Sequence, residues 1–203
     1  GASGSEIASA YARMGTEVLL IEMLPQILPA EDADIAKIVE RSFKKDGIEI
    51  STGAPVENVE VGKDSVKFTY GDNSAEVDYL CIAGGRAPDT KGLGLELAGI
   101  ELEENGKVKV NAEQCTANPK VYAIGDLVNA KALAHKASEE AVVAAESAAG
   151  VETQPLLQGL VAGATFTHPQ VASVGLTEAQ AKEAGHEVKV GKQKIAGEGA
   201  GTV

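Results

Sequence analysis

A glycine turn at the start of the sequence and an acidic residue further on have the types and spacing needed to bind a dinucleotide. The turn reads G-A-S-G-S-E over residues 1–6. Glu22 follows Gly1 by 21 positions, close to the ~20 that separate such a turn from the acid that holds an adenine ribose. The free N–H groups at a helix N-terminus suit a pyrophosphate, and a carboxylate repels a 2′-phosphate. No Lys or Arg occurs between residues 23 and 36, so the sequence favours NAD over NADP.

The turn is only part of a dinucleotide-binding motif. The full pattern, G-x-G-x-x-G, places a strand and a further glycine before it, and the sequence starts at what corresponds to the second glycine. A partial pattern is also compatible with an ordinary helix, turn and strand. Both interpretations stay open on the motif alone.

Regular hydrophobic patterns predict the elements that would position the turn and the acid. Apolar residues recur at helical spacing over residues 7–14, and Gly15 ends that helix. Residues 17–22 form a short apolar strand that ends in the acid. A helix over 31–46 and a strand over 48–50 continue the alternation. This order predicts an α/β fold with a Rossmann-like, doubly wound nucleotide-binding domain.

The hydrophobic pattern changes to a period of two over residues 55–83. Three short alternating runs predict a small antiparallel β-meander, with strands at 56–61, 66–70 and 77–81. The last run continues as an apolar strand to residue 83, in which Cys81 is expected to be a core residue. A β-meander would therefore be inserted before the closing strand of the nucleotide-binding domain.

The second half of the sequence alternates loops with short regular elements. The pattern predicts strands over 108–110 and 121–126 and a helix over 132–149. A helix over 178–184 and a strand over 187–195 follow.

Composition and charge exclude several classes of protein. The chain has 203 residues, of which 44% are hydrophobic, as in a globular α/β protein. Its net charge of −12 argues against nucleic acid or an anionic membrane as a partner, and no apolar run approaches the ~18 residues of a membrane span. Cys81 and Cys115 form neither a C-x-x-C nor a metal-binding pattern, which is compatible with a reducing compartment.

Several stretches together resemble one family, the FAD-dependent pyridine nucleotide-disulfide oxidoreductases. In the order of the family they are G-A-S-G-S-E with Glu22, I-L-P-A-E-D-A-D-I, A-G-G-R-A-P-D-T with L-G-L, V-Y-A-I-G-D, L-A-H-K-A-S-E-E and T-H-P-Q-V-A-S-V-G-L-T-E. The second and the last favour the branch that acts on dihydrolipoamide. The resemblance covers nearly the whole sequence and implies an enzyme that uses FAD to oxidise a dithiol and passes hydride to NAD. It also implies a homodimer, a lipoyl-bearing protein of a 2-oxo acid dehydrogenase complex as partner, and a location in the cytoplasm or the mitochondrial matrix.

The resemblance further implies two groups of cofactor-binding residues. For NAD, the turn under the pyrophosphate would be formed by Gly1, Ala2, Ser3, Gly4 and Ser5, and Glu6 would face the nicotinamide end. Glu22 would hold the adenine ribose and Val56 would contact the adenine. The far side of the cleft would be lined by Ala83, Gly84, Gly85 and Arg86. The family usually has a branched residue where Gly84 stands. For FAD, Asp126 would accept a hydroxyl of the ribityl chain, and the N–H groups of Leu133, Ala134 and His135 would point at the flavin's pyrimidine edge. A helix N-terminus there would stabilise negative charge on a reduced flavin.

Structural roles stay open for three polar residues. Asp126 could cap a helix or close a turn, and His135 could be a capping or solvated residue at a helix start. His168, which precedes Pro169, is more simply a turn residue than a catalytic one.

Two parts of the family's chemistry are missing from the sequence. The redox C-x-x-x-x-C pair and the FAD-binding G-x-G-x-x-G do not occur, so no catalytic residue and no metal ligand is assigned. The expected arrangement is a central piece of the enzyme. Residues 1–86 would form the NAD-binding domain without its first strand, residues 87–156 the second segment of the FAD-binding domain, and residues 157–203 the start of an α+β interface (dimerisation) domain.

The piece alone is expected to bind FAD poorly, to be marginally stable and to carry out no disulfide chemistry. Two alternatives remain for its function. One is another flavoprotein disulfide reductase of the family, such as a mercuric or glutathione-type reductase or a transhydrogenase. The other is a catalytically inactive nucleotide-binding fragment.

Overall fold

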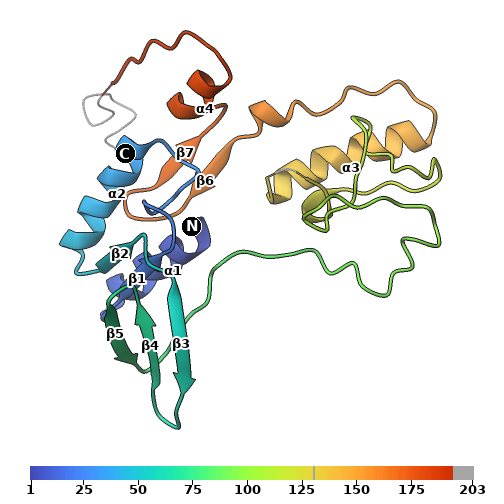
Figure 1. Ribbon diagram of the computed structural model, residues 1–203. Helices are drawn as coiled ribbons and strands as arrows, with labels where there is room; N and C mark the ends of the chain where they lie inside the picture. The colour runs from blue at the N-terminus through green and yellow to red at the C-terminus, as the bar shows by residue number, and fades with distance from the viewer. Residues whose placement is uncertain (130, 194–203) are drawn as a thin grey trace.

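The computed structural model describes residues 1–129 and 131–193 and has two lobes joined by extended segments (Figure 1). One lobe contains both ends of the described chain, and the other is built around helix α3 and the loops beside it. The helices and strands of the first lobe are α1 (Ala2–Arg13), β1 (Leu19–Glu22), α2 (Ala33–Lys45), β2 (Glu49–Thr52), β3 (Val56–Val61), β4 (Val66–Tyr70), β5 (Asn73–Val77), β6 (Gly163–Thr165), β7 (Val171–Ser173) and α4 (Glu178–Glu183). The second lobe contains α3 (Ala134–Ala148) and the 3-10 turn η1 (Gly125–Leu127), and a further 3-10 turn, η2 (Gln158–Leu160), leads back to the first.

Strands β1 and β2 form the parallel pair that the alternating sequence predicts. Leu19 pairs with Glu49 and Glu22 with Thr52, so the acid lies at the carboxyl end of its strand. Helix α2 turns one apolar face toward the pair because its buried residues Ala36, Val39 and Phe43 recur at helical spacing. The core of this lobe joins α1, α2 and β7 through Ala8, Ile27, Leu28, Val39, Phe43, Ile48 and Val171.

The β-meander is present, but the third predicted strand was wrong. Strand β5 runs over Asn73–Val77 and not over 77–81, because Tyr70 pairs with Asn73 and leaves only two residues in the turn. Gly71 has φ +54° there, a conformation that glycine allows at the first position of a tight hairpin turn. The strand therefore begins four residues earlier than its apolar pattern indicated.

The expected apolar strand over residues 79–83 does not form within the described residues. Tyr79 and Ile82 are 91% and 86% exposed, and Cys81 is exposed rather than a core residue. A strand needs a neighbour for its backbone hydrogen bonds and apolar side chains, and no described strand lies beside this segment. Leu80 alone packs against the meander, in the cluster around Phe68 and Tyr70.

Two further predicted strands, 108–110 and 121–126, are replaced by irregular segments with isolated bridges. Val108 bridges to both Leu102 and Val128, and Tyr122 bridges to Cys115. These segments still pack against one another, because Val108, Ala123 and Val128 form the buried apolar centre of the second lobe. The predicted helix over 132–149 is confirmed by α3.

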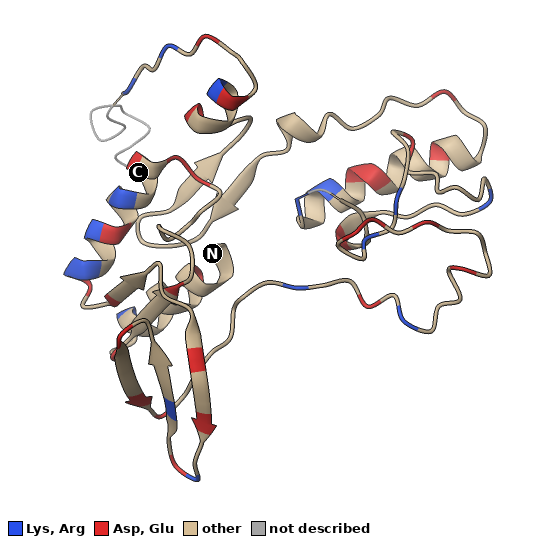
Figure 2. Ribbon diagram, viewed as in Figure 1, with Lys and Arg blue, Asp and Glu red and all other residues tan. Residues whose placement is uncertain are grey.

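The carboxyl-terminal segment packs back against α1 and α2 of the first lobe. The predicted helix over 178–184 is confirmed by α4, whereas residues 187–193 form no strand. Residues 194–195 of that predicted strand, and the remainder of the expected interface domain to residue 203, lie outside the described residues. Among the described residues, none of the helices is both long and apolar enough to cross a bilayer. Figure 2 shows acidic residues distributed over both lobes, with a row of Lys and Arg along α2.

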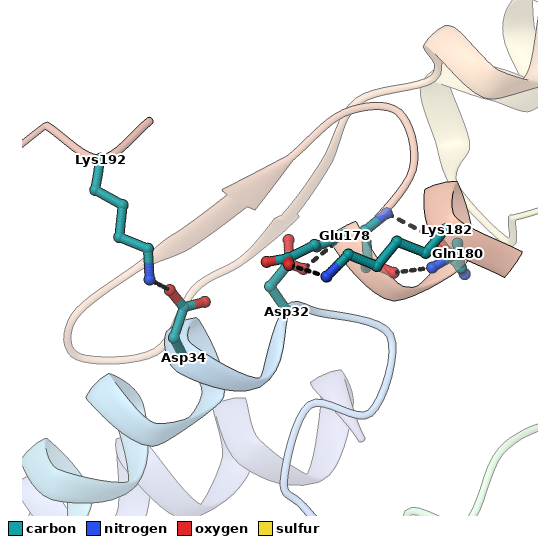
Figure 3. A network of polar contacts seen from close by, with 7 residues as sticks. Asp32, Asp34, Glu178, Gln180, Lys182 and Lys192 are labelled. Atoms are coloured by element: carbon teal, nitrogen blue, oxygen red, sulfur yellow. Dashed lines mark hydrogen bonds and ion pairs between the residues drawn. The ribbon is translucent and has the colours of Figure 1, made fainter. Parts of the chain in front are cut away.

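Polar contacts hold the carboxyl-terminal segment to the N-terminus of α2 (Figure 3). Asp32 Oδ1 accepts the N–H of Glu178 at 2.8 Å. Lys182 pairs with Glu178 one turn along α4, and Lys192 pairs with Asp34. The hydrogen bond from Lys192 holds the pKa of Asp34 below its usual value, and the same contact raises the pKa of Lys192. These contacts are exposed, so only the Asp32 bond, which is partly buried, is expected to contribute measurably to stability.

Replacing Asp32 by alanine is expected to lower the free energy of unfolding by about 1 kcal/mol. The change removes the acceptor of the Glu178 N–H, so that amide should also exchange its hydrogen faster. Urea denaturation and amide hydrogen exchange measure the two effects. Asp32→Asn, which keeps an oxygen acceptor, is the control. Equal losses in the alanine and asparagine variants would show that the hydrogen bond is not what holds α4 in place.

Candidate nucleotide-binding sites

The predicted glycine turn is largely helical, because Ala2, Ser3, Gly4 and Ser5 already belong to α1. Gly1 is the N-cap of α1 and no side chain caps this end among the described residues. The Ser5 N–H donates to the carbonyl of Gly1 at 3.0 Å, which leaves the N–H groups of the first helical turn without helical acceptors. Ala2 and Ser3 are exposed and Ser5 is buried. This end of α1 can therefore donate hydrogen bonds to an anion.

Glu22 meets the same turn from the end of strand β1. Its Oε2 forms an ion pair with the amino-terminal ammonium of Gly1 at 2.6 Å, and its Oε1 accepts the N–H of Leu24 at 3.0 Å. Partial burial raises the pKa of Glu22, but these contacts outweigh it and the pKa lies below its usual value. The carboxylate is consequently charged at neutral pH, next to the turn from which it is separated by 21 positions in sequence.

The segment expected to line the far side of the cleft also reaches the turn. A Cβ atom at Gly4 would lie 3.4 Å from the Cβ atom of Ala83, which is contact distance, so this segment lies against the start of α1. Gly84, Gly85 and Arg86 continue from Ala83 as exposed residues, and a Cβ at Gly84 would meet nothing described within 4 Å.

Val56 and Glu6 lie at the edges of this group. Val56 begins β3 and is 38% exposed. Two residues earlier in the chain, the N–H of Ala54 donates a hydrogen bond to the carbonyl of Glu22 at 3.3 Å. Glu6 is placed in the second turn of α1, where its Oε1 accepts the N–H of Phe166 at 2.7 Å. The structure thus brings Gly1, Gly4, Glu22 and Ala83 together, whereas the Glu6 carboxylate binds the β6–β7 segment.

The residues expected at FAD lie together in the second lobe. Asp126 is exposed in the 3-10 turn η1, not at the end of a strand as predicted, because none of the described strands pairs with residues 121–124. Turn η1 contacts helix α3, which begins at Ala134 with Leu133 as its N-cap and no side-chain cap among the described residues. His135 Nε2 lies 2.9 Å from the carbonyl oxygen of Ala162, so its ring serves a structural contact while the helix N–H groups stay available.

Two charged residues of this lobe were missed by sequence reasoning. Lys136 and Glu140 are fully buried in α3 and form an ion pair behind the Asp126 turn. Their spacing of four residues is common on exposed helix faces, so the sequence carried no signal that these two charges are buried.

Comparison with known proteins identifies the family. Residues 1–141 match the family described as pyridine nucleotide-disulphide oxidoreductase. The chain belongs to the pyridine nucleotide-disulphide oxidoreductase family. Residues 161–202 match the dimerisation domain of the same family. Membership confirms the resemblance, the α/β fold with a Rossmann-type domain, and FAD and a pyridine nucleotide as the family's cofactors.

Relatives and solved structures of the family match nearly all of the chain. A dihydrolipoyl dehydrogenase of Thermus scotoductus is 43% identical over 198 residues, which are 95% of this chain and 42% of that protein. The crystal structure of LpdA from Mycobacterium tuberculosis has a TM-score of 0.84 at 30% identity, covering 91% of this chain and 40% of LpdA. The HOCl-induced flavoprotein disulfide reductase RclA from Escherichia coli has a TM-score of 0.83 at 29% identity, covering 92% and 43%. The chain therefore spans less than half the length of each of these family members.

Proposed function

We propose that the chain is part of a dihydrolipoamide dehydrogenase, which oxidises protein-bound dihydrolipoamide through FAD and transfers hydride to NAD. The observation that carries the proposal is the position of Glu22, whose carboxylate at the end of β1 lies beside the start of α1. The similarity to the Thermus scotoductus dihydrolipoyl dehydrogenase over 95% of the chain supports the choice of substrate. A second candidate is a flavoprotein disulfide reductase with another substrate, which the similarity to RclA favours.

The residues around Gly1 fit a dinucleotide that carries no 2′-phosphate. The N–H groups of the first turn of α1 would donate to the pyrophosphate. Glu22 would accept the adenine ribose hydroxyls, and its negative charge would repel a phosphate at the 2′ position. Val56 would contact the adenine, residues 83–86 would border the opposite side, and Glu6 would face the nicotinamide end. These residues bind and orient NAD; none of them changes its own oxidation state.

The residues around η1 fit the middle and the reactive end of FAD. Asp126 would accept a ribityl hydroxyl, and the exposed start of α3 at Leu133, Ala134 and His135 would direct N–H groups toward the flavin. The positive end of the helix dipole stabilises negative charge there. When bound, FAD and NAD would supply the two-electron chemistry that converts a dithiol to a disulfide: both electrons and one proton would pass to NAD as hydride, and the second proton would go to solvent.

The domain division follows from the same assignments. Residues 1–86 would belong to the NAD-binding domain, residues 87–156 to the FAD-binding domain and residues 157–203 to the interface domain. The match of residues 161–202 to a dimerisation domain supports a homodimer of the longer protein. A lipoyl-bearing protein of a 2-oxo acid dehydrogenase complex would be its partner, in the cytoplasm or the mitochondrial matrix.

The proposal is tested on the purified protein that contains this chain. Oxidation of dihydrolipoamide is measured with NAD and with NADP, and reduction of glutathione disulfide is measured with NADPH. Dihydrolipoamide oxidation with NAD is expected to be much the fastest of the three reactions. Faster glutathione disulfide reduction, or no oxidation of dihydrolipoamide, would overturn the proposed substrate in favour of a sister reductase.

A further inference from the structure

Helix α3 buries an ion pair whose hydrogen bonds converge on a single residue of the Asp126 turn. Lys136 Nζ and Glu140 Oε2 are 3.0 Å apart, and both side chains are fully inaccessible to solvent. Glu140 Oε2 accepts the N–H of Gly125 at 2.8 Å, and Lys136 Nζ donates to the carbonyl of Gly125 at 3.0 Å. The two side chains therefore bind both backbone polar groups of Gly125.

Gly125, which takes part in both hydrogen bonds, has a backbone conformation that favours glycine. Its φ of +72° is one that side-chain-bearing residues rarely adopt, and a Cβ atom here would lie 3.4 Å from the Cβ of Ala137. The turn is therefore pressed against α3 while the pair holds its N–H and its carbonyl. Gln158 Nε2 donates to the remaining oxygen of Glu140, Oε1, at 2.9 Å, so η2 helps to orient the carboxylate.

A buried ion pair is a poor means of stabilising a protein, because the cost of removing two charges from water can exceed their attraction. Well-packed apolar residues could fill the same space. Apolar residues could not bind the backbone of Gly125, and so they could not fix the orientation of the next residue, Asp126, relative to α3.

We propose that Lys136 and Glu140 are positioning residues that lock the Gly125 turn and thereby hold Asp126 in the orientation that receives FAD. The proposal rests on the proposed role of Asp126 in FAD binding. Asp126 itself is exposed, and the 3-10 turn that contains it contacts α3. Preorganising the turn removes the ordering cost that binding would otherwise meet.

Two neutral double variants of the full 203-residue chain separate positioning from mere stability. K136M/E140Q removes both charges and keeps a carbonyl oxygen that can accept the Gly125 N–H. K136M/E140L also removes both charges and has a similar volume, but it offers no acceptor. The readouts are the hydrogen-exchange rate of the Gly125 N–H in this chain, measured by NMR, and the dissociation constant of FAD for the purified protein that contains the chain with the same substitutions.

The leucine variant is expected to exchange the Gly125 N–H about tenfold faster than the glutamine variant and to bind FAD several-fold more weakly. Exchange rates and FAD affinities that agree within about twofold, in two folded variants, would overturn the proposal. If the purified protein that contains this chain binds no FAD while the exchange rates still differ, the FAD-binding role assigned to the chain fails and the locking of the turn stands.

The wild-type chain decides the question if the leucine variant does not fold. A Gly125 N–H locked by a buried carboxylate should be protected from exchange about a hundredfold or more relative to an exposed loop amide. Exchange at the rate of an exposed loop amide would overturn the proposal.

Discussion

Replacing Lys136 by methionine is expected to lower the free energy of unfolding by about 3–5 kcal/mol. The change leaves the fully buried carboxylate of Glu140 without its cation and removes the donor to the carbonyl of Gly125. Breaking a buried pair from one side is far more costly than removing the whole pair, because an unpaired charge remains in a medium of low dielectric constant. Urea denaturation, with the slope compared between variants, measures the loss.

The chain offers a matched control in the pair of Lys182 and Glu178. These residues also lie four positions apart on a helix, but their side chains are 59% and 42% exposed. Lys182→Met is therefore expected to change stability by less than about 0.5 kcal/mol. K136M/E140L should recover most of the stability that Lys136→Met loses. Similar losses in the Lys136 and Lys182 variants would contradict the account of Lys136 as a buried, paired cation.

Replacing Glu22 by glutamine is expected to weaken NAD binding by roughly 10- to 100-fold, since hydrogen bonds to a charged group contribute about 1.5–3 kcal/mol. NADP binding should be unchanged or improved, because the charge that repels the 2′-phosphate is gone. Isothermal titration with each nucleotide measures both effects. Glu17→Gln is the control, because Glu17 is an exposed acid at the other end of the β1 segment.

The pH dependence of the preference for NAD over NADP follows from the lowered pKa of Glu22. Partial burial raises that pKa, but the amino-terminal ammonium of Gly1 and the N–H of Leu24 together outweigh burial and lower it. A lowered pKa keeps the carboxyl group charged down through the pH range in which a glutamate usually titrates, so the preference for NAD should stay constant there and fade only as the pH falls through the lowered pKa. An NAD preference that declines between neutral pH and the usual Glu pKa would contradict this assignment.

Local patterns were sufficient for helices α2, α3 and α4, and topology was sufficient for the meeting of Gly1 and Glu22. Helix α1 instead begins at Ala2, five residues before the apolar pattern of residues 7–14. Helices α2, α3 and α4 follow the predicted ranges closely because a helix satisfies its own backbone hydrogen bonds. The acid meets the turn because a helix and a short return bring the end of β1 back to the start of α1.

The predicted strands that failed depend on partners that sequence patterns do not specify. Residues 79–83 have the composition of a strand but no described strand pairs with them, and residues 121–124 form only an isolated bridge. The burial of Lys136 and Glu140 could not be predicted either. Their position inside the lobe is set by contacts with Gly125 and Gln158, which lie 11 and 18 positions away from them in sequence.

The chain is proposed to carry an assembled dinucleotide site that selects NAD through Glu22. Thermal unfolding of the wild-type chain with NAD or NADP tests this proposal most directly. A nucleotide at about 100 times its dissociation constant adds about 2.7 kcal/mol to the stability of the folded state. In a chain of this size that corresponds to a rise of roughly 5–10 °C in the unfolding midpoint. The account predicts such a rise with NAD and little or none with NADP at the same concentration. Equal rises with both nucleotides, a larger rise with NADP, or no rise with NAD would contradict it.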